Sequence, residues 1–313
     1  MSWRHVLEAY DLLDSAHVTG ERVAAVLRAR DLDCRVERVE GPHGTTDVVR
    51  VFVPGARGRA AGGGARTLGI IGRLGGIGAR PARLGLVSDA DGAITAIACA
   101  LKLADMRREG DVLPGDVILA THICPRALVR ETPTVPMMMS PVDMAVLNAR
   151  EVDPAMEAII SVDTTRGNRV VNHKGIAISF PVKEGYMLPA PDALLDLYQW
   201  VTGRPPVILP LTTQDITPYG TRLRHINSIL QPATATRAPV IGLALTAETM
   251  VPGSATGASD AADIEVAVRF CLEVAKAFGA GACDFYDARE FDELVARFGP
   301  MTRLQTTGQT LPV

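Results

Sequence analysis

Hydrophobic positions along the chain alternate between short apolar runs, typical of buried strands, and longer segments with apolar residues every three or four positions, typical of helices. The helical pattern covers residues 6–13, 20–30, 190–202, 222–230 and 260–278, and a long apolar stretch of small residues ends near residue 106. Strands are predicted at residues 34–39, 46–53, 67–72, 116–121, 158–162, 173–181, 207–211 and 239–245. Prolines make residues 132–139 a loop or an edge strand, and residues 140–148 form a helix or a turn.

The order of these elements indicates the fold class. Apolar strands alternate with helices from residue 67 to residue 278, with no linker between them and no repeat of fixed period. Continuous apolar strands joined by helices are typical of a largely parallel sheet covered on both faces. We therefore expect one α/β domain over residues 1–313.

Composition and charge exclude several classes of protein. Aromatic residues make up 4% of the chain and the net charge is −3, with no basic stripe, so nucleic-acid binding is not expected. No segment approaches the roughly 18 to 20 apolar residues that span a bilayer, and the first residues lack a signal core. The five cysteines form no Cys-x-x-Cys pair, which excludes a zinc ribbon and predicts reduced thiols in a cytoplasmic protein.

A glycine-rich segment follows the strand at residues 67–72, with glycines at positions 72, 75, 76 and 78. We reject a dinucleotide-binding loop, because Pro81 follows and no helix begins there. The glycines instead predict turns with positive φ or a close approach of the backbone to a ligand.

Chemically competent side chains follow several of the predicted strands. Asp89 and Asp91 lie on a turn ahead of the small-residue helix, His122 and Arg126 follow the strand at 116–121, and Asp163 follows the strand at 158–162. Ligands of open α/β sheets bind at the carboxyl ends of the strands, so we expect these groups to meet there. Two alternatives stay open: Ser88, Asp89 or Asp91 caps the helix, and His122 is a hydrogen-bonded structural histidine.

Two segments carry a resemblance over nearly the whole chain. The stretches GIIGRLGGIGARPARLGLVSDADGA and SVDTTRGNRVVNHKG resemble the bacterial and archaeal family named after the domain of unknown function DUF1177. This resemblance by itself implies no activity.

The chain also resembles, more remotely, co-catalytic zinc aminopeptidases of the phosphorylase/hydrolase-like fold. The segment HVTGE at residues 17–21 is similar to the turn that follows their first helix, and Val162–Asp163 is similar to their "Val-Asp" strand end. By position, Asp89 is similar to the Asp that bridges their two metals. The resemblance implies a three-layer αβα sandwich with a mixed, mostly parallel central sheet.

The departures from the aminopeptidase pattern are equally specific. Arg73 and Gly75 stand where a His-x-Asp ligand pair is expected, and Thr121–His122 replaces the expected Glu-Glu pair. No late histidine follows Glu248, and the short connection before Asp89 leaves no room for the second domain that many of these peptidases insert. Two complete metal sites are therefore not expected.

The remaining groups suggest a reduced site. Asp89, Asp163 and His122 could hold one divalent metal, Zn²⁺, Mn²⁺ or Mg²⁺, with Asp91 as a further candidate. His122 or Asp91 would act as general base; sequence alone does not separate His122 as ligand from His122 as base. By the remote resemblance, Arg73 stands where a metal-binding His is expected, so its guanidinium, together with that of Arg126, would bind a substrate carboxylate.

Three functions stay open at this stage. The first is a metal-dependent hydrolase of amide bonds in small amino-acid-like substrates, and the second is a metal-free acid–base enzyme in the same cleft. The third is a non-catalytic protein that binds a small ligand or serves as an oligomeric scaffold. The partners expected are a small-molecule substrate or ligand and further copies of the chain in a homo-oligomer, with neither nucleic acid nor membrane.

Overall fold

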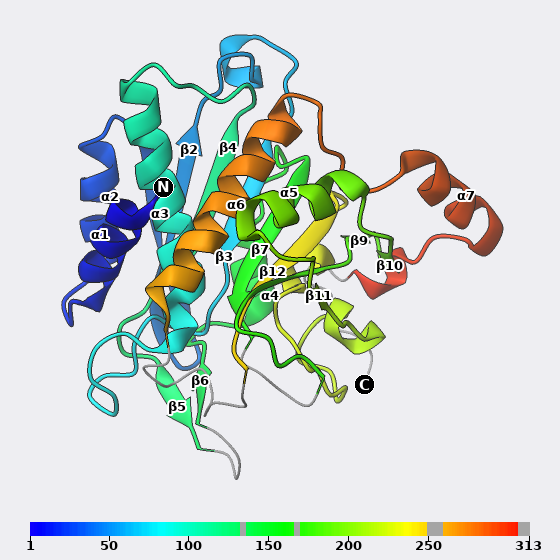
Figure 1. The fold of residues 1–313 in the computed structure, drawn as a ribbon. Helices are drawn as coiled ribbons and strands as arrows, with labels where there is room; N and C mark the ends of the chain where they lie inside the picture. The colour runs from blue at the N-terminus through cyan, green and yellow to red at the C-terminus, as the bar shows by residue number, and fades with distance from the viewer. Residues whose placement is uncertain (132–135, 166–169, 249–258, 306–313) are drawn as a thin grey trace.

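A ten-stranded mixed sheet runs through the molecule (Figure 1). The computed structural model describes residues 1–131, 136–165, 170–248 and 259–305. The main strand order is β1-β2-β4-β3-β7-β12-β8-β11, and β9 joins β12 and β10. The strands are β1 (Asp33–Gly41), β2 (Gly44–Val53), β3 (Leu68–Gly72), β4 (Val117–Ile123), β7 (Ala158–Thr164), β8 (Gly175–Ser179), β9 (Val182–Lys183), β10 (Tyr186–Met187), β11 (Ile208–Leu209) and β12 (Val240–Thr246).

The centre of the sheet is parallel. Strands β4, β3, β7 and β12 lie side by side in one direction, with Ile71 of β3 opposite Ala120 on one side and Ser161 on the other. Antiparallel pairs with β2 and β8 flank this centre. The carboxyl ends of four central strands therefore share one edge, as the sequence predicts.

Helices cover both faces of the sheet, which confirms the three-layer fold. Five helices share a buried apolar cluster with one face: α1 (Trp3–Asp14), α2 (Gly20–Arg28), α3 (Asp91–Arg108), α5 (Asp192–Thr202) and α6 (Ala261–Gly279). The opposite face packs against α4 (Met144–Glu151) and the 3-10 turns η3 (Thr213–Ile216) and η4 (Gln231–Thr234). Neighbouring residues such as Ile70 and Ile71 of β3 enter different clusters because side chains alternate across a strand.

Helix α3 lies directly over the ends of two central strands. A Cβ atom on Gly92, in its first turn, would lie 2.6 Å from the carbonyl oxygen of Val162, and one on Gly72 would lie 2.3 Å from the oxygen of Gly92. Only glycine permits this approach. The contact fixes the turn before α3 at the carboxyl edge of the sheet.

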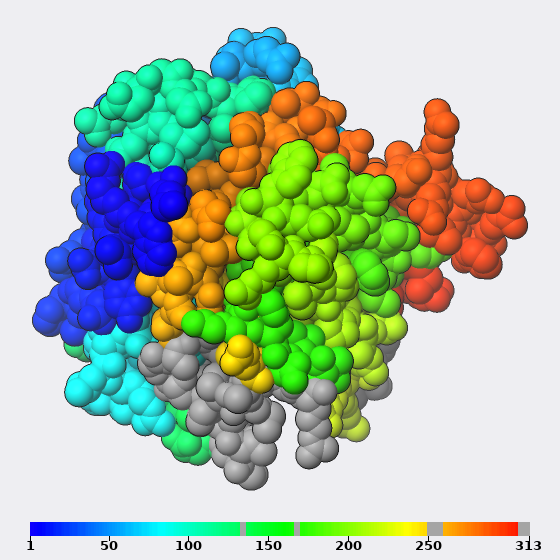
Figure 2. Space-filling model, in the orientation of Figure 1, coloured from blue at the N-terminus to red at the C-terminus, as the bar shows by residue number. Residues whose placement is uncertain are grey.

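Two predictions about helices need correction. Residues 222–230 contain no helix, because Oδ1 of Asp215 accepts the backbone N–H groups of Ile226 and Asn227 and so holds the segment as a loop. The sequence analysis also missed α7 (Ala288–Phe298), which Asp287 caps through two backbone N–H groups. This helix projects from one side of the molecule (Figures 1 and 2), where Phe291 packs against Tyr186 of β10.

The ambiguous segments are now assigned where the structure describes them. Of residues 140–148, those from Met144 onwards lie in helix α4, and Met137–Met139 forms strand β6, which pairs with β5 (Leu128–Arg130). Residues 132–135 of the proline-rich segment, and residues 166–169 after Asp163, lie outside the described residues. Among the helices described, none is long and apolar enough to cross a membrane. The single-domain organisation stays a prediction.

Candidate functional site

Asp89 is bound by the glycine-rich turn that follows β3. It lies in η2 (Ser88–Ala90), immediately before α3, and its Oδ2 atom accepts the backbone N–H groups of Gly75 at 2.6 Å and Gly76 at 3.2 Å. Asp89 therefore accepts hydrogen bonds from the glycine-rich turn, and no side-chain capping bond is made at the start of α3 within the described residues. The glycines do permit close approach, as predicted, but the group approached is Asp89, and neither Gly75 nor Gly76 has a positive φ.

Asp163 reaches the same edge at the end of β7. Its Oδ1 atom accepts the backbone N–H of Thr164 at 2.8 Å, and its Oδ2 atom accepts the hydroxyl of Ser228 at 2.7 Å. The hydroxyl of Thr164 donates in turn to the carbonyl oxygen of Ser88 at 2.5 Å. This last bond ties the end of β7 to the turn that carries Asp89.

A buried ion-pair network lies beside Asp163. Glu151, the last residue of α4, accepts from Nη1 of Arg73 through Oε2 and lies 2.7 Å from Nδ1 of His122 through Oε1. Arg73 and His122 come from the ends of β3 and β4, and the three side chains expose at most 1% of their surface. Within the described residues, Nε of Arg73 and Nε2 of His122 have no hydrogen-bond partner.

Electrostatics separate the two aspartates. Burial raises the pKa of Asp89 to about 8, and the nearby charge of Asp163 adds to this, while the two glycine N–H groups oppose it. Burial also raises the pKa of Asp163, but only to about 6, because the Ser228 hydroxyl and the Arg73 charge favour its ionised form. At neutral pH Asp163 is therefore ionised and Asp89 is protonated.

The pKa of Glu151, in contrast, is lowered. Burial acts to raise the pKa of Glu151, yet the charges of Arg73 and His122 hold it below its ordinary value. Tyr219 lies near Ser228 and Asp163. Burial, together with the charge of Asp163, raises the pKa of this phenol to about 12, and its ring lies 4.3 Å from the ring of His225.

The structure does not bring all of the predicted site residues together. Arg126 is exposed and lines a separate hollow of about 310 Å³, which none of Arg73, Asp89, His122 and Asp163 lines. Arg73 is buried and paired with a carboxylate of the protein itself. Asp91 is buried at the start of α3, where its Oδ1 atom accepts the hydroxyl of Ser259 at 2.5 Å. The substrate-binding roles of Arg73 and Arg126 and the catalytic role of Asp91 stay predictions.

The donor set does not fit a preformed metal site. Among the described residues, no three His, Cys, Asp or Glu side chains are grouped so that they could hold a metal ion. A zinc site needs three or four protein ligands. Near Asp163, the Arg73 guanidinium supplies positive charge that favours the ionised carboxylate. The predicted set of Asp89, Asp163 and His122 is thus not assembled, and we derive no chemical step through a metal.

Sequence reasoning missed Glu151, Ser228 and Tyr219. A signal existed for Glu151, because it follows the buried Leu147 by four residues and so lies on the buried side of α4. Ser228 and Tyr219 lie in a stretch without regular structure, and no pattern in the sequence places them beside Asp163.

Several solved structures share the fold. The bottromycin maturation enzyme BotP is 17% identical, with a TM-score of 0.55 over 90% of this chain and 70% of its own. A leucine aminopeptidase from Caenorhabditis elegans is 10% identical, with a TM-score of 0.53 over 90% of this chain and 65% of its own. A glutaminyl cyclase from an Acidobacteriales bacterium is 11% identical, with a TM-score of 0.50 over 90% of this chain and 94% of its own.

These likenesses confirm the aminopeptidase-like fold and no more, since the identities are low. The chain spans about two thirds of the length of the BotP and worm aminopeptidase chains. No curated protein sequence matches it. Residues 37–308 match the family of proteins of unknown function designated DUF1177, and the chain belongs to that family.

Proposed function

We propose that this protein hydrolyses amide bonds in small amino-acid-like substrates, with Asp163 as general base and Asp89 as general acid. The observation that carries the proposal is the difference in pKa between two neighbouring buried carboxyls. The pKa of Asp163 is about 6 and that of Asp89 is about 8. Paired groups whose pKa values are pushed to opposite sides of neutrality are suited to acid and base roles.

Each carboxyl is oriented for its role. Both oxygens of Asp163 accept hydrogen bonds, which stabilise the carboxylate that takes a proton from the attacking water. Oδ2 of Asp89 accepts two N–H groups, so the proton of this carboxyl resides on Oδ1. In the reaction the water oxygen bonds to the carbonyl carbon, the C–N bond breaks, and Asp89 supplies the proton that the leaving amine needs.

The substrate class rests on the shared fold. Aminopeptidases named among the structural relatives act on amide bonds, and the same fold serves BotP and a glutaminyl cyclase. The Arg73 guanidinium supports the base by placing positive charge beside Asp163. We therefore favour Asp163 and Asp89 over His122 and Asp91 as the groups that exchange protons with substrate.

The test is hydrolysis of a panel of amino-acid amides, dipeptides and N-acyl amino acids, followed by mass spectrometry. For any substrate found, Asp163→Asn and Asp89→Asn should each lower kcat/KM by about 10²- to 10⁴-fold. The exposed Asp111→Asn change should leave it unaltered. No hydrolysis across the panel would count against an amide hydrolase.

Metal analysis separates this proposal from the metal-dependent one. Protein purified without chelator should contain far less than one equivalent of Zn²⁺ or Mn²⁺. One equivalent in the native protein, lost in both Asp89→Asn and Asp163→Asn, would contradict the acid–base pair and favour a metal site.

The low exposure of Asp89 and Asp163 also favours a second function, the binding of a small ligand without catalysis. Asp89 is 7% exposed and Asp163 is 4% exposed, which suits a small-ligand-binding protein as well as an enzyme. A thermal-shift screen over amino acids and short peptides would reveal a stabilising ligand. Stabilisation without turnover would favour this non-catalytic function. Homo-oligomerisation and a cytoplasmic location stay predictions.

A further inference from the structure

A second hollow lies on the opposite side of the sheet from α3, between α4 and residues 234–238. We call it the α4 hollow; its volume is about 710 Å³, within the range of small-molecule sites. Its walls are mostly small and apolar: Val146, Ala149, Val152, Pro154, Met156 and Ala235. It shares no lining residue with the Asp89–Asp163 site.

The charge in the α4 hollow is of one sign. No Asp or Glu lines it, whereas Arg150 and Arg237 do. Arg150 is already engaged, because its Nε atom donates to Glu37 at 2.8 Å and Nη1 donates to the carbonyl oxygen of Val146 at 3.1 Å. The guanidinium of Arg237 is exposed and has no hydrogen-bond or ion-pair partner within the described part of the chain.

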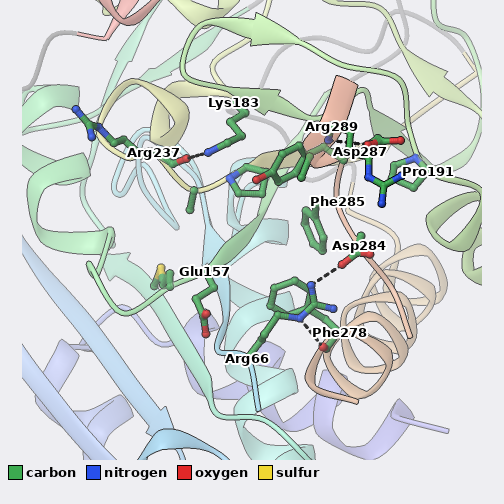
Figure 3. Close-up of a pocket in the computed structure, with 15 residues that line it drawn as sticks. Arg66, Glu157, Lys183, Pro191, Arg237, Phe278, Asp284, Phe285, Asp287 and Arg289 are labelled. Atoms are coloured by element: carbon green, nitrogen blue, oxygen red, sulfur yellow. Dashed lines mark hydrogen bonds and ion pairs between the residues drawn. The ribbon is translucent and has the colours of Figure 1, made fainter. Parts of the chain in front are cut away.

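A neighbouring hollow of about 930 Å³ shares Met156, Arg237 and Ala238 with the α4 hollow but differs in charge. Carboxylates line it, and its Arg66 pairs with Asp284 at 2.5 Å (Figure 3). Figure 3 also shows the side chain of Arg237 extending away from Phe285 and out of this neighbouring hollow. An anion is therefore better accommodated on the α4 side of Arg237.

The floor of the α4 hollow carries a further unsatisfied group. Asn148 is 2% exposed; its Nδ2 atom donates to the carbonyl oxygen of Gln231 at 3.1 Å, but its Oδ1 atom has no partner among the described residues. An apolar cavity with few polar groups and one unpaired cation is typical of a site for an amphiphilic ligand. We propose that the α4 hollow binds a small amphiphilic carboxylate, with its apolar body against α4 and its carboxylate on Arg237.

The test is calorimetric titration of the full chain with 3-phenylpropionate and octanoate, each compared with its uncharged amide. Both acids should bind saturably, and Arg237→Gln should weaken them about fivefold or more, while Arg237→Lys retains part of the affinity. The amides should bind weakly and be insensitive to Arg237→Gln. Arg289→Gln, which removes a cation lining only the neighbouring hollow, is the matched control and should have no effect.

A steric variant tests the location independently. Ala149 is exposed on α4, so Ala149→Trp should fold normally, which circular dichroism checks, and should abolish binding by filling the α4 hollow. Absence of saturable binding of either acid up to about 10 mM would overturn the proposal. Equal losses in Arg289→Gln and Arg237→Gln, or full binding by Ala149→Trp, would overturn it as well.

Discussion

Nδ1 of His122 lies 2.7 Å from Oε1 of Glu151, and neither side chain has exposed surface. The second oxygen of Glu151 is paired with Arg73, so a single carboxylate joins the ends of β3 and β4 to the end of α4. The structure thus gives the predicted residues Arg73 and His122 a common acidic partner. This partner, Glu151, comes from α4, on the face of the sheet opposite α3. The relationship supports the structural alternative for His122, and its roles as ligand or base stay predictions.

Breaking this network should destabilise the fold strongly. Arg73→Met or Glu151→Gln leaves a buried charge without its partner, and each should lower the free energy of unfolding by about 3–5 kcal/mol, measured by urea denaturation. The double variant should cost less than the two single changes together. The exposed pair of Arg297 and Glu293 on α7 is the matched control, since its loss should cost well under about 1 kcal/mol. Equal costs for the two pairs would contradict the role of the network.

Asp89 should make the protein less stable as the pH rises. Its pKa is about 8 when folded and near 3.8 when unfolded, so the folded state holds a proton that the unfolded state releases. The favourable contribution is complete below about pH 4 and is lost as the pH rises towards 8. Relative to Asp89→Asn, the native chain should lose on the order of 3–5 kcal/mol across this window in urea titrations. A constant difference from pH 4 to 8 would argue against the raised pKa.

The activity proposed here should have a bell-shaped pH dependence. The rate constant kcat/KM should rise as Asp163 ionises near pH 6 and fall as Asp89 loses its proton near pH 8. Because the two carboxyls interact, the two limbs report apparent pKa values of the pair. Ser228→Ala removes a donor to Asp163 and should move the acidic limb to higher pH. Ser15→Ala should not, because the Ser15 hydroxyl contacts His17 and Arg22 instead. An acidic limb unmoved by Ser228→Ala would contradict the assignment of Asp163.

The close contact between α3 and the strand ends should not tolerate a side chain. Gly92→Ala would place a Cβ atom 2.6 Å from the oxygen of Val162 and 2.7 Å from that of Arg73, both backbone atoms. We expect a loss of about 1–3 kcal/mol or more in the free energy of unfolding, together with a displaced Asp89. Gly64→Ala, where nothing lies within 4 Å, should be nearly neutral. Thermal melts of the two variants provide the comparison.

Local sequence patterns predict the αβα fold, the order of its main elements and the edge of the sheet at which Asp89, His122 and Asp163 lie. These follow from local periodicity and from the rule that parallel strands bring their carboxyl ends together. Periodicity failed at residues 222–230, where the side chain of Asp215 binds the backbone and prevents a helix. The same periodicity is present in α7, where Phe291, Leu294, Val295 and Phe298 have helical spacing.

The side-chain contacts within the site depend on tertiary packing. Glu151 pairs with Arg73, Ser228 donates to Asp163, and two glycine N–H groups donate to Asp89, through contacts between residues of different elements and loops. Burial and these partners place the pKa values of the two aspartates on either side of neutrality. Sequence spacing carries no information on desolvation or on the distance between side chains from separate elements. The acid–base pair could therefore be inferred only after the strands and helices were packed together.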